Sequence, residues 1–212
     1  MKYKAVIFDL DGTLLNTIED LKNSVNYALE SCGMPVRTLD EVRRFVGNGI
    51  KNLMRRAVPD GEDNPLFEKA FSLFKEHYSK NCCVMTKAYD GIPEMLDKLR
   101  SNGIKTAIVS NKAENAVKTL SDTFFGGMTA FGDKDGRERK PAPDTVFAAL
   151  DELGVKPEEA VYSGDSEVDI MTAANAGMKC ISVSWGFKGR KFLEEHNAEI
   201  IIDRPEEIFR YI

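Results

Sequence analysis

The chain has 212 residues, and 42% of them are hydrophobic, which is enough for a packed core in one or two domains. The formal net charge is −5, and no cluster of basic residues indicates a nucleic-acid partner. No apolar run is long enough for a membrane span, and the run near the N-terminus breaks at Asp9, which argues against a secretory signal. We therefore expect a cytoplasmic protein with reduced cysteines.

The first expected element is a buried strand over residues 3–8, which is rich in β-branched and aromatic side chains and ends in a turn at residues 9–13. The pattern then changes, because apolar residues recur at helical spacing from residue 17 to about residue 86. This spacing predicts a helix that begins near Ile18 and further helices over residues 39–45, 50–57 and 65–78, with no strand between them.

Beyond Tyr89 the helical and strand patterns alternate. The expected strands cover residues 104–109, 160–162, 179–183 and 199–202, and the expected helices cover residues 92–101, 113–120, 143–153 and 168–176. The glycine-rich residues 126–136 predict a loop. Strands separated by helices indicate a parallel sheet covered on both faces. We therefore expect an α/β domain of residues 1–16 and 87–212, with a helical block of residues 17–86 inserted after its first strand.

Polar side chains follow the predicted strands, at the sheet edge where ligands bind in open α/β folds. Carboxylates follow the first and a later strand, a hydroxyl and an amide follow another, and a lysine precedes the helix over residues 143–153. These residues are Asp9, Asp11, Ser110, Asn111, Lys140, Asp165 and Asp169. Each has a simpler explanation, since Asp and Gly favour turns, Ser and Asn cap helices, and acids favour helix N-termini. Their order and shared edge favour one common site.

The crowded carboxylates of this edge predict a bound cation. Two carboxylates 4 Å apart repel by roughly 4 kcal/mol at an effective dielectric constant near 20, so they require a metal ion or raised pKa values. The candidate ligands are all oxygens, which selects Mg²⁺ over zinc or copper. Because magnesium accepts phosphate oxygens as further ligands, the sequence favours a phosphorylated substrate.

These segments resemble, in order, the motifs of the haloacid dehalogenase superfamily of phosphohydrolases. The matching segments are residues 9–14, Ser110-Asn111, Lys140-Pro141 and residues 164–169. The resemblance covers essentially the whole chain and implies a Rossmann-like core with a mobile helical cap, hinged near Asn16 and Lys87. Asn16 departs from the pattern, because many relatives carry Asp there, but Asn can still cap the helix that begins near Ile18.

The resemblance also implies a role for each motif residue. Asp9 would attack phosphorus to form an aspartyl phosphate, and Asp11 would protonate the leaving alkoxide and then deprotonate the hydrolytic water. Magnesium would bind Asp9, the Asp11 carbonyl and Asp165, while Asp169 would act through water or by orienting the ligands. A role of Glu167 at the metal stays open. The groups expected to hold the phosphoryl oxygens are Ser110, Lys140 and the backbone N–H groups near Gly12 and Asn111.

Within the superfamily the chain is most similar to bacterial phosphoglycolate phosphatases, through residues 43–49 and 184–187. This similarity implies a small phosphorylated metabolite, with 2-phosphoglycolate the first choice, and Arg43 and Asn48 as substrate-binding residues. Trp185 is expected to be a packing residue. A pyrophosphatase, or a sugar-phosphate phosphatase or mutase, is the alternative within the superfamily, and a receiver-type signalling domain the alternative outside it. Both a monomer and a homodimer are compatible with the sequence.

Overall fold

The computed structural model describes residues 2–47 and 49–212, which form two compact units. One unit comprises the residues up to Leu15 together with Ala88–Ile212, and the other comprises Asn16–Lys87. The chain passes between them through β2 (Leu15–Asn16) and β3 (Lys87–Ala88), which pair with each other as a separate two-stranded sheet. No helix in the described residues has both the length and the hydropathy needed to cross a membrane.

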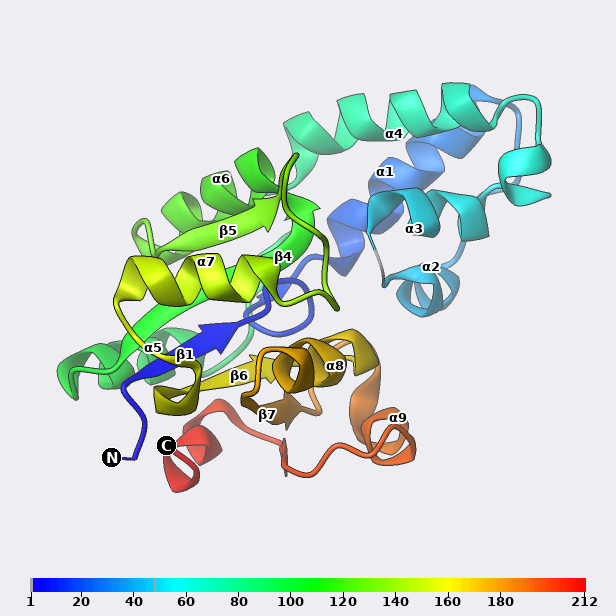
Figure 1. The fold of residues 1–212 in the computed structure, drawn as a ribbon. Coiled ribbons are helices and arrows are strands. Elements are labelled where there is room, and N and C mark those ends of the chain that lie inside the picture. The colour runs from blue at the N-terminus through cyan, green and yellow to red at the C-terminus, as the bar shows by residue number, and fades with distance from the viewer. Residues whose placement is uncertain (1, 48) are drawn as a thin grey trace. The chain divides into compact units, whose positions relative to one another are not determined.

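A six-stranded sheet forms the centre of the first unit (Figure 1). Its strand order is β5-β4-β1-β6-β7-β8, and the neighbouring strands pair in parallel. The strands are β1 (Ala5–Phe8), β4 (Lys105–Ala113), β5 (Ala130–Asp133), β6 (Ala160–Gly164), β7 (Lys179–Val183) and β8 (Ile201–Ile202). The predicted α/β fold, a Rossmann-like parallel sheet, is confirmed.

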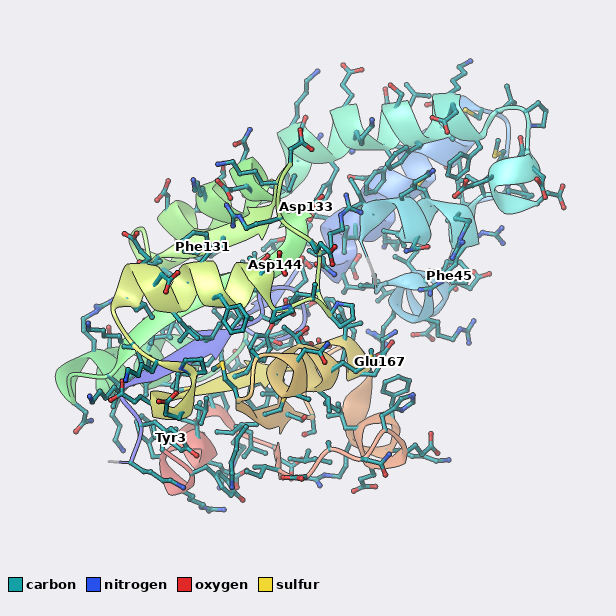
Figure 2. The ribbon with its side chains drawn as sticks, in the orientation of Figure 1. Tyr3, Phe45, Phe131, Asp133, Asp144 and Glu167 are labelled. Atoms are coloured by element: carbon teal, nitrogen blue, oxygen red, sulfur yellow. The ribbon has the colours of Figure 1, made fainter. Side chains whose placement is uncertain are left out.

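Strand β5, which carries Phe131 and Asp133 (Figure 2), lies in the segment for which the glycines predict a loop. That part of the prediction is wrong for a physical reason. A Cβ atom at Gly132 would lie 2.5 Å from Glu114 Cα and 2.6 Å from the Lys112 carbonyl oxygen. Glycine therefore marks a close approach of two backbones in this strand rather than a turn.

Helices cover both faces of the sheet (Figure 1). They are α5 (Ile92–Ser101), α6 (Glu114–Phe125), α7 (Asp144–Leu153) and α8 (Glu167–Asn175), followed by α9 (Gly189–Glu195), which the sequence patterns did not predict. Helices α7 and α8 pack around Ile7 and Tyr162, both fully buried. Helices α5 and α6 lead to β4 and β5, which lie on one side of β1, whereas α7 and α8 lead to β6 and β7 on the other side. Because parallel crossovers are right-handed, α5 and α6 cover the face of the sheet opposite to that covered by α7 and α8.

The second unit is a helical bundle of α1 (Ile18–Ser31), α2 (Leu39–Phe45), α3 (Ile50–Ala57) and α4 (Phe67–Asn81). Helices α1 and α4 pack along each other and bury Val25, Leu29 and Phe74 completely. Helix α2 begins with a capping box, in which Thr38 and Glu41 bind each other's backbone N–H groups. The helical spacing of residues 17–86 therefore corresponds to buried faces within this unit.

A buried carboxylate connects the first and last segments of the helical unit. Asp20, in the first turn of α1, is 2% exposed and accepts hydrogen bonds from the backbone N–H groups of Met85 and Thr86 and from the Thr86 hydroxyl, at 2.8–3.0 Å. No local pattern predicts this contact, because its partners lie 65 and 66 residues away. Asp20 therefore joins the start of α1 to the segment that leaves the unit.

Replacing Asp20 by Ala is expected to destabilise the helical unit by about 2–4 kcal/mol, because buried N–H groups lose a charged acceptor. Asp20→Asn, which keeps one acceptor oxygen, should cost less. Urea denaturation and amide exchange at Met85 and Thr86 measure the effect. Glu19→Ala is the matched control, since Glu19 is partly exposed and pairs with Lys22 at 2.7 Å. Equal stability losses for Asp20→Ala and Glu19→Ala would contradict this role.

Candidate active site

A buried lysine joins two carboxylates at the C-terminal edge of the sheet. Asp9 follows β1, Lys140 lies between β5 and α7, and Asp169 lies in the first turn of α8. The Lys140 ammonium donates hydrogen bonds to Asp9 Oδ1 at 2.7 Å and to Asp169 Oδ1 at 2.8 Å. The fold therefore brings together residues from three motifs that are far apart in the sequence.

Tyr162 completes this network, although no motif identifies it. Its hydroxyl accepts a hydrogen bond from Lys140 at 3.0 Å and lies 3.1 Å from Asp169 Oδ1, to which it donates. The side chain is fully buried on β6. The available sequence signal, one tyrosine in a mostly apolar strand, is explained equally well by packing, so its position at the site emerges from the structure.

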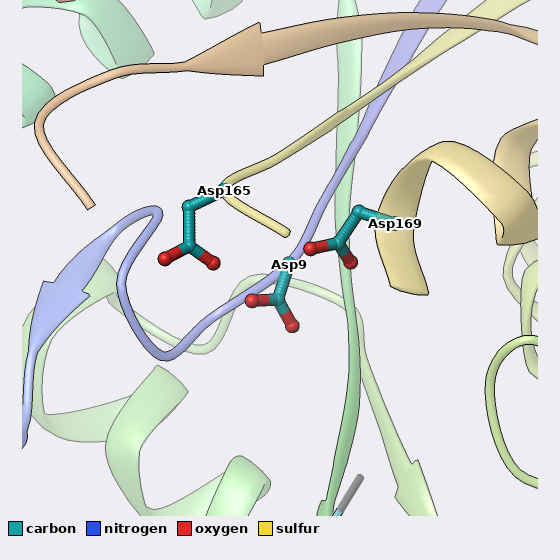
Figure 3. Close-up of side chains that lie close together, drawn as sticks. All are labelled: Asp9, Asp165 and Asp169. Carbon is teal, nitrogen blue, oxygen red and sulfur yellow. The ribbon is translucent and has the colours of Figure 1, made fainter. Parts of the chain in front are cut away.

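Asp165 brings a third carboxylate to the same place (Figure 3). Asp9, Asp165 and Asp169 each offer an oxygen, and these oxygens lie within 4.8 Å of one another. Two glycines permit this packing. A Cβ atom at Gly12 would lie 2.4 Å from Asp165 Oδ2, and one at Gly186 would lie 2.3 Å from Asp165 Cβ. The glycines on both sides of Asp165 are therefore needed for the position of its carboxylate.

The charges of this cluster are unbalanced. Burial raises the pKa of Asp9 to about 7, although the Lys140 ammonium opposes the shift. Burial, followed by the charges of Asp169 and Asp9, raises the pKa of Asp165 well above its usual value, and a 2.7 Å hydrogen bond from the Phe187 N–H offsets only part of this. Burial disfavours the charged form of Lys140, but Asp169 and Asp9 outweigh it and raise its pKa. Lys140 therefore does not neutralise all three acids.

A hard divalent cation fits this donor set. Among the described residues Asp165 forms no ion pair with a basic side chain. Asp169 is more fully occupied, because Oδ1 accepts from Lys140 and Oδ2 accepts from the backbone N–H and the hydroxyl of Ser166. A donor set made only of carboxylate oxygens suits Mg²⁺. The residues present are thus compatible with a magnesium ion beside Asp9 and Asp165.

Other buried oxygens occur at this edge. Thr13 Oγ1, Ser163 Oγ and Glu167 Oε2 are buried and have no hydrogen-bond partner within the described part of the chain. Thr13 follows β1, Ser163 is near the end of β6, and Glu167 begins α8 (Figure 2). Glu167 is not part of the group of three carboxylates. Unpartnered buried polar atoms at one edge are typical of a site that binds a ligand, an ion or water.

Asp11 lies beside a second buried lysine. Its Oδ1 atom is 3.1 Å from Nζ of Lys112, which is near the end of β4. The Lys112 side chain is 4% exposed and that of Asp11 is 19% exposed. Ser110, on the same strand, is buried, and its hydroxyl accepts a 3.2 Å hydrogen bond from the Lys112 N–H. Asp11 is therefore accessible from outside, whereas the ammonium next to it is shielded.

Neighbouring side chains hold the loops of the site in place. The Asn111 side chain donates to the Lys140 carbonyl at 3.0 Å and accepts from the Lys140 N–H at 2.9 Å. Trp185 Nε1 donates a 3.0 Å hydrogen bond to the Thr13 carbonyl. Asn111 therefore fixes the backbone that carries the buried lysine. Trp185 orients the loop after β1, a role beyond the packing that its residue type predicts.

The expected substrate-binding residues belong to the helical unit. Arg43 lies on α2, where its Nη1 atom is 3.0 Å from Asp40 Oδ1 and its side chain is 42% exposed. Asn48 lies outside the described residues. The backbones of Gly12 and Asn111, by contrast, belong to the sheet unit together with the acidic cluster.

The parallel sheet, with buried acids and a buried lysine at its C-terminal edge, is that of an α/β enzyme. The model of the haloacid dehalogenase-like hydrolase family matches residues 6–183, and the chain belongs to this family. The family recognised from the motifs is thus confirmed. The chain is accordingly an enzyme, a hydrolase similar to the phosphoglycolate phosphatases.

Individual relatives agree with the family. Phosphoglycolate phosphatase 1 of Pseudomonas aeruginosa is 32% identical over 97% of this chain and 78% of its own length. Phosphoglycolate phosphatase of Aquifex aeolicus is 31% identical over 98% of this chain and 95% of its own. The crystal structure of a protein from Lactobacillus delbrueckii subsp. bulgaricus, with suggested phosphoglycolate phosphatase activity, has a TM-score of 0.92 and 36% identity, and covers 98% of this chain and 97% of its own.

Proposed function

We propose that this enzyme hydrolyses 2-phosphoglycolate, or a similarly small phosphate ester that carries a carboxylate, through a phosphorylated Asp9. The observation that carries the proposal is the buried contact of Asp9 with Lys140, beside a second acid that fits a magnesium ion. The names of the relatives support the choice of substrate. The free cysteines among the described residues fit a cytoplasmic enzyme.

In the first half of the reaction Asp9 is the nucleophile. A carboxylate oxygen of Asp9 forms a bond to phosphorus while the bond from phosphorus to the ester oxygen breaks. Asp11 gives its proton to the leaving oxygen. Lys140 holds Asp9 in place and balances the charge of the phosphoryl group, together with the Ser110 hydroxyl and the backbone N–H groups near Gly12 and Asn111. Orientation and charge stabilisation thus supply most of the rate.

In the second half Asp11 takes a proton from water, the water oxygen attacks phosphorus, and the bond from phosphorus to Asp9 breaks. Inorganic phosphate leaves, and the Asp9 carboxylate is restored. Both halves require the same two carboxylates, which are two residues apart in the sequence. A single side chain that alternates between acid and base must be accessible to both leaving group and water, and the partial exposure of Asp11 meets this requirement.

We propose that Asp9, Asp165 and the Asp11 carbonyl hold a magnesium ion, and that Asp169 acts by orienting Lys140. When bound, the metal would neutralise the crowded carboxylates and polarise the phosphoryl oxygens. The oxygens of Asp169 are occupied by donors from the protein, which makes Asp169 a less available direct ligand. Asp165 is free of such ion pairs among the described residues and is the better ligand.

Replacing Asp165 by Asn is expected to raise the Tm of the metal-free protein by roughly 2–6 °C, because a buried charge beside like charges is removed. The same change should abolish the rise in Tm that magnesium causes in the wild-type enzyme, since a ligand that binds the folded state stabilises it. Thermal denaturation with EDTA and with saturating Mg²⁺ measures both effects. Asp122→Asn, at an exposed position of α6, is the control. A full magnesium response in Asp165→Asn would contradict the assignment.

We further propose that the helical unit, residues 17–86, acts as a mobile cap that excludes water during the reaction and hinges near Asn16 and Lys87. Arg43 and Asn48 of this unit would bind the substrate carboxylate or phosphate. The division of the chain into two units joined by β2 and β3 supports this proposal. A monomer or a homodimer could work in this way, because each chain carries both units.

The substrate assignment is tested with a panel of phosphates in the presence of Mg²⁺. The panel contains 2-phosphoglycolate, pyrophosphate, hexose phosphates and p-nitrophenyl phosphate. We expect the highest kcat/KM for 2-phosphoglycolate and repeated turnover of p-nitrophenyl phosphate. A tenfold preference for pyrophosphate or for a hexose phosphate would overturn the assignment, and stoichiometric phosphorylation without release would indicate a signalling domain.

A further inference from the structure

We propose that Lys112 binds the carboxylate of the substrate and thereby selects esters whose leaving group carries a carboxylate next to the reacting oxygen. This inference rests on the proposed phosphatase function and names the substrate class of the same site. Lys112 belongs to none of the motif positions to which the sequence assigns a role. It is the buried cation beside Asp11, whereas Lys140 contacts Asp9 and Asp169.

The position of the ammonium is fixed by the fold. Lys112 is near the C-terminal end of β4, and its N–H donates to the Ser110 hydroxyl at 3.2 Å. Its carbonyl oxygen lies so close to Gly132 of β5 that a Cβ atom there would be 2.6 Å away. The side chain is 4% exposed, and Nζ lies 3.1 Å from Asp11 Oδ1. A long side chain, which is usually mobile, is therefore held at one place in the site.

The chemistry of the leaving group places a carboxylate near this ammonium. A group that protonates the leaving oxygen must lie within about 3 Å of it. In phosphoglycolate a single carbon separates this oxygen from the carboxylate carbon. An ammonium in contact with Asp11 is therefore within reach of that carboxylate once the leaving oxygen faces Asp11. The Lys112 ammonium donates through N–H groups, so a substrate carboxylate can accept a hydrogen bond that Asp11 accepts in the free enzyme.

The contact also explains how recognition and reaction are coupled. In the free enzyme Asp11 Oδ1 is in contact with the ammonium of Lys112. A substrate carboxylate competes for the protons of this ammonium and frees Asp11 to face the leaving oxygen. An ester without a carboxylate lacks this competition, so Asp11 stays bound to Lys112. A charge-assisted contact in a shielded place gives stronger selection than the same contact in water.

The test compares substrates that differ only near the leaving oxygen. The probes are 2-phosphoglycolate, 2-phospho-L-lactate and ethyl phosphate, which lacks the carboxylate, and the readout is the ratio of their kcat/KM values. In Lys112→Met the preference for 2-phosphoglycolate over ethyl phosphate should fall by at least roughly 30-fold, the effect of losing a hydrogen bond to a charged group. Lys112→Arg should keep most of the preference.

The controls separate recognition from folding and from orientation. Lys118→Met, at an exposed position of α6 where Lys118 pairs with Glu114 at 3.0 Å, should keep the wild-type ratio. Lys112→Gln is the second variant if Lys112→Met lowers the Tm strongly, and it should lose the preference as well. A loss in Lys112→Met of the same size for all three esters would show that Lys112 only orients Asp11, and the inference would be wrong.

The wild-type enzyme separates this inference from the proposed function. If it prefers 2-phospho-L-lactate and loses that preference in Lys112→Met, the inference holds and the assignment of phosphoglycolate fails. If its kcat/KM for ethyl phosphate equals that for both carboxylate-bearing esters, the inference fails while the phosphatase activity stands.

Discussion

Replacing Asp9 by Asn is expected to lower kcat by roughly 10⁴-fold or more, because the amide cannot attack phosphorus. The protein should remain folded. An Asn side chain at this position keeps an oxygen that can accept the hydrogen bond from Lys140, which in the wild-type enzyme is 2.7 Å long. Phosphate release in the presence of Mg²⁺ measures the loss of turnover.

The covalent step can be followed directly. Intact-mass measurement of acid-quenched wild-type enzyme should detect one added phosphoryl group, and the corresponding peptide should contain Asp9. Asp9→Asn should show no added group, whereas Asp151→Asn, at an exposed position of α7, should behave as the wild type. Near-normal activity in purified Asp9→Asn, or a phosphoryl group on another residue, would overturn the mechanism.

Replacing Lys140 by Met is expected to destabilise the enzyme by about 3–5 kcal/mol and to abolish turnover, because buried Asp9 and Asp169 lose their shared cation. Urea denaturation with EDTA measures the loss of stability. Adding Asp169→Asn to Lys140→Met should restore part of the stability, because the double variant no longer buries the uncompensated charge of Asp169. It should not restore activity. The pair therefore separates the structural effect of Lys140 from its catalytic effect.

The response to magnesium and a surface control test whether Lys140 stabilises the enzyme by neutralising the buried acids. Saturating Mg²⁺ should stabilise Lys140→Met more than the wild-type enzyme, because the ion then neutralises acids that have no other cation nearby. Lys118→Met on the surface of α6 should change neither stability nor turnover by a large factor. A Lys140→Met variant as stable as the wild type without metal would show that the buried acids do not depend on this ammonium.

The parallel sheet and the edge at which the acids gather could be predicted because their signals are local. The strand that ends at Phe8, the turn after it and the later alternation of helices and strands each appear in a short window of sequence. The order of the motifs then places Asp9, Lys140 and Asp165 at one edge. Such reasoning needs only the rule that parallel strands end on the same side of a sheet.

The features that could not be predicted depend on contacts between distant segments. Strand β5 contains a glycine because two backbones approach closely there, whereas the same residue type in a short window indicates a turn. Tyr162 belongs to the site because of its contacts with Lys140 and Asp169, and it has no local signature. Lys112 follows Ser110-Asn111 at the sheet edge in the sequence, but its contact with Asp11 appears only in the fold. Asp20 is an ordinary acid in the first turn of a helix until the segment 65 residues later reaches it.

The contact of Asp20 with Met85 and Thr86 has a consequence for engineering. The acceptor, Asp20, lies just after the first junction of the inserted unit, and the donors, Met85 and Thr86, lie just before the second. The hydrogen bonds that join the two ends of the insertion are therefore made within the insertion itself. A chimaera that transplants this unit into a related scaffold should have its boundaries before Asp20 and after Thr86, so that these hydrogen bonds are kept. A graft with boundaries between Asp20 and Thr86 would separate them and would yield a frayed, protease-sensitive product.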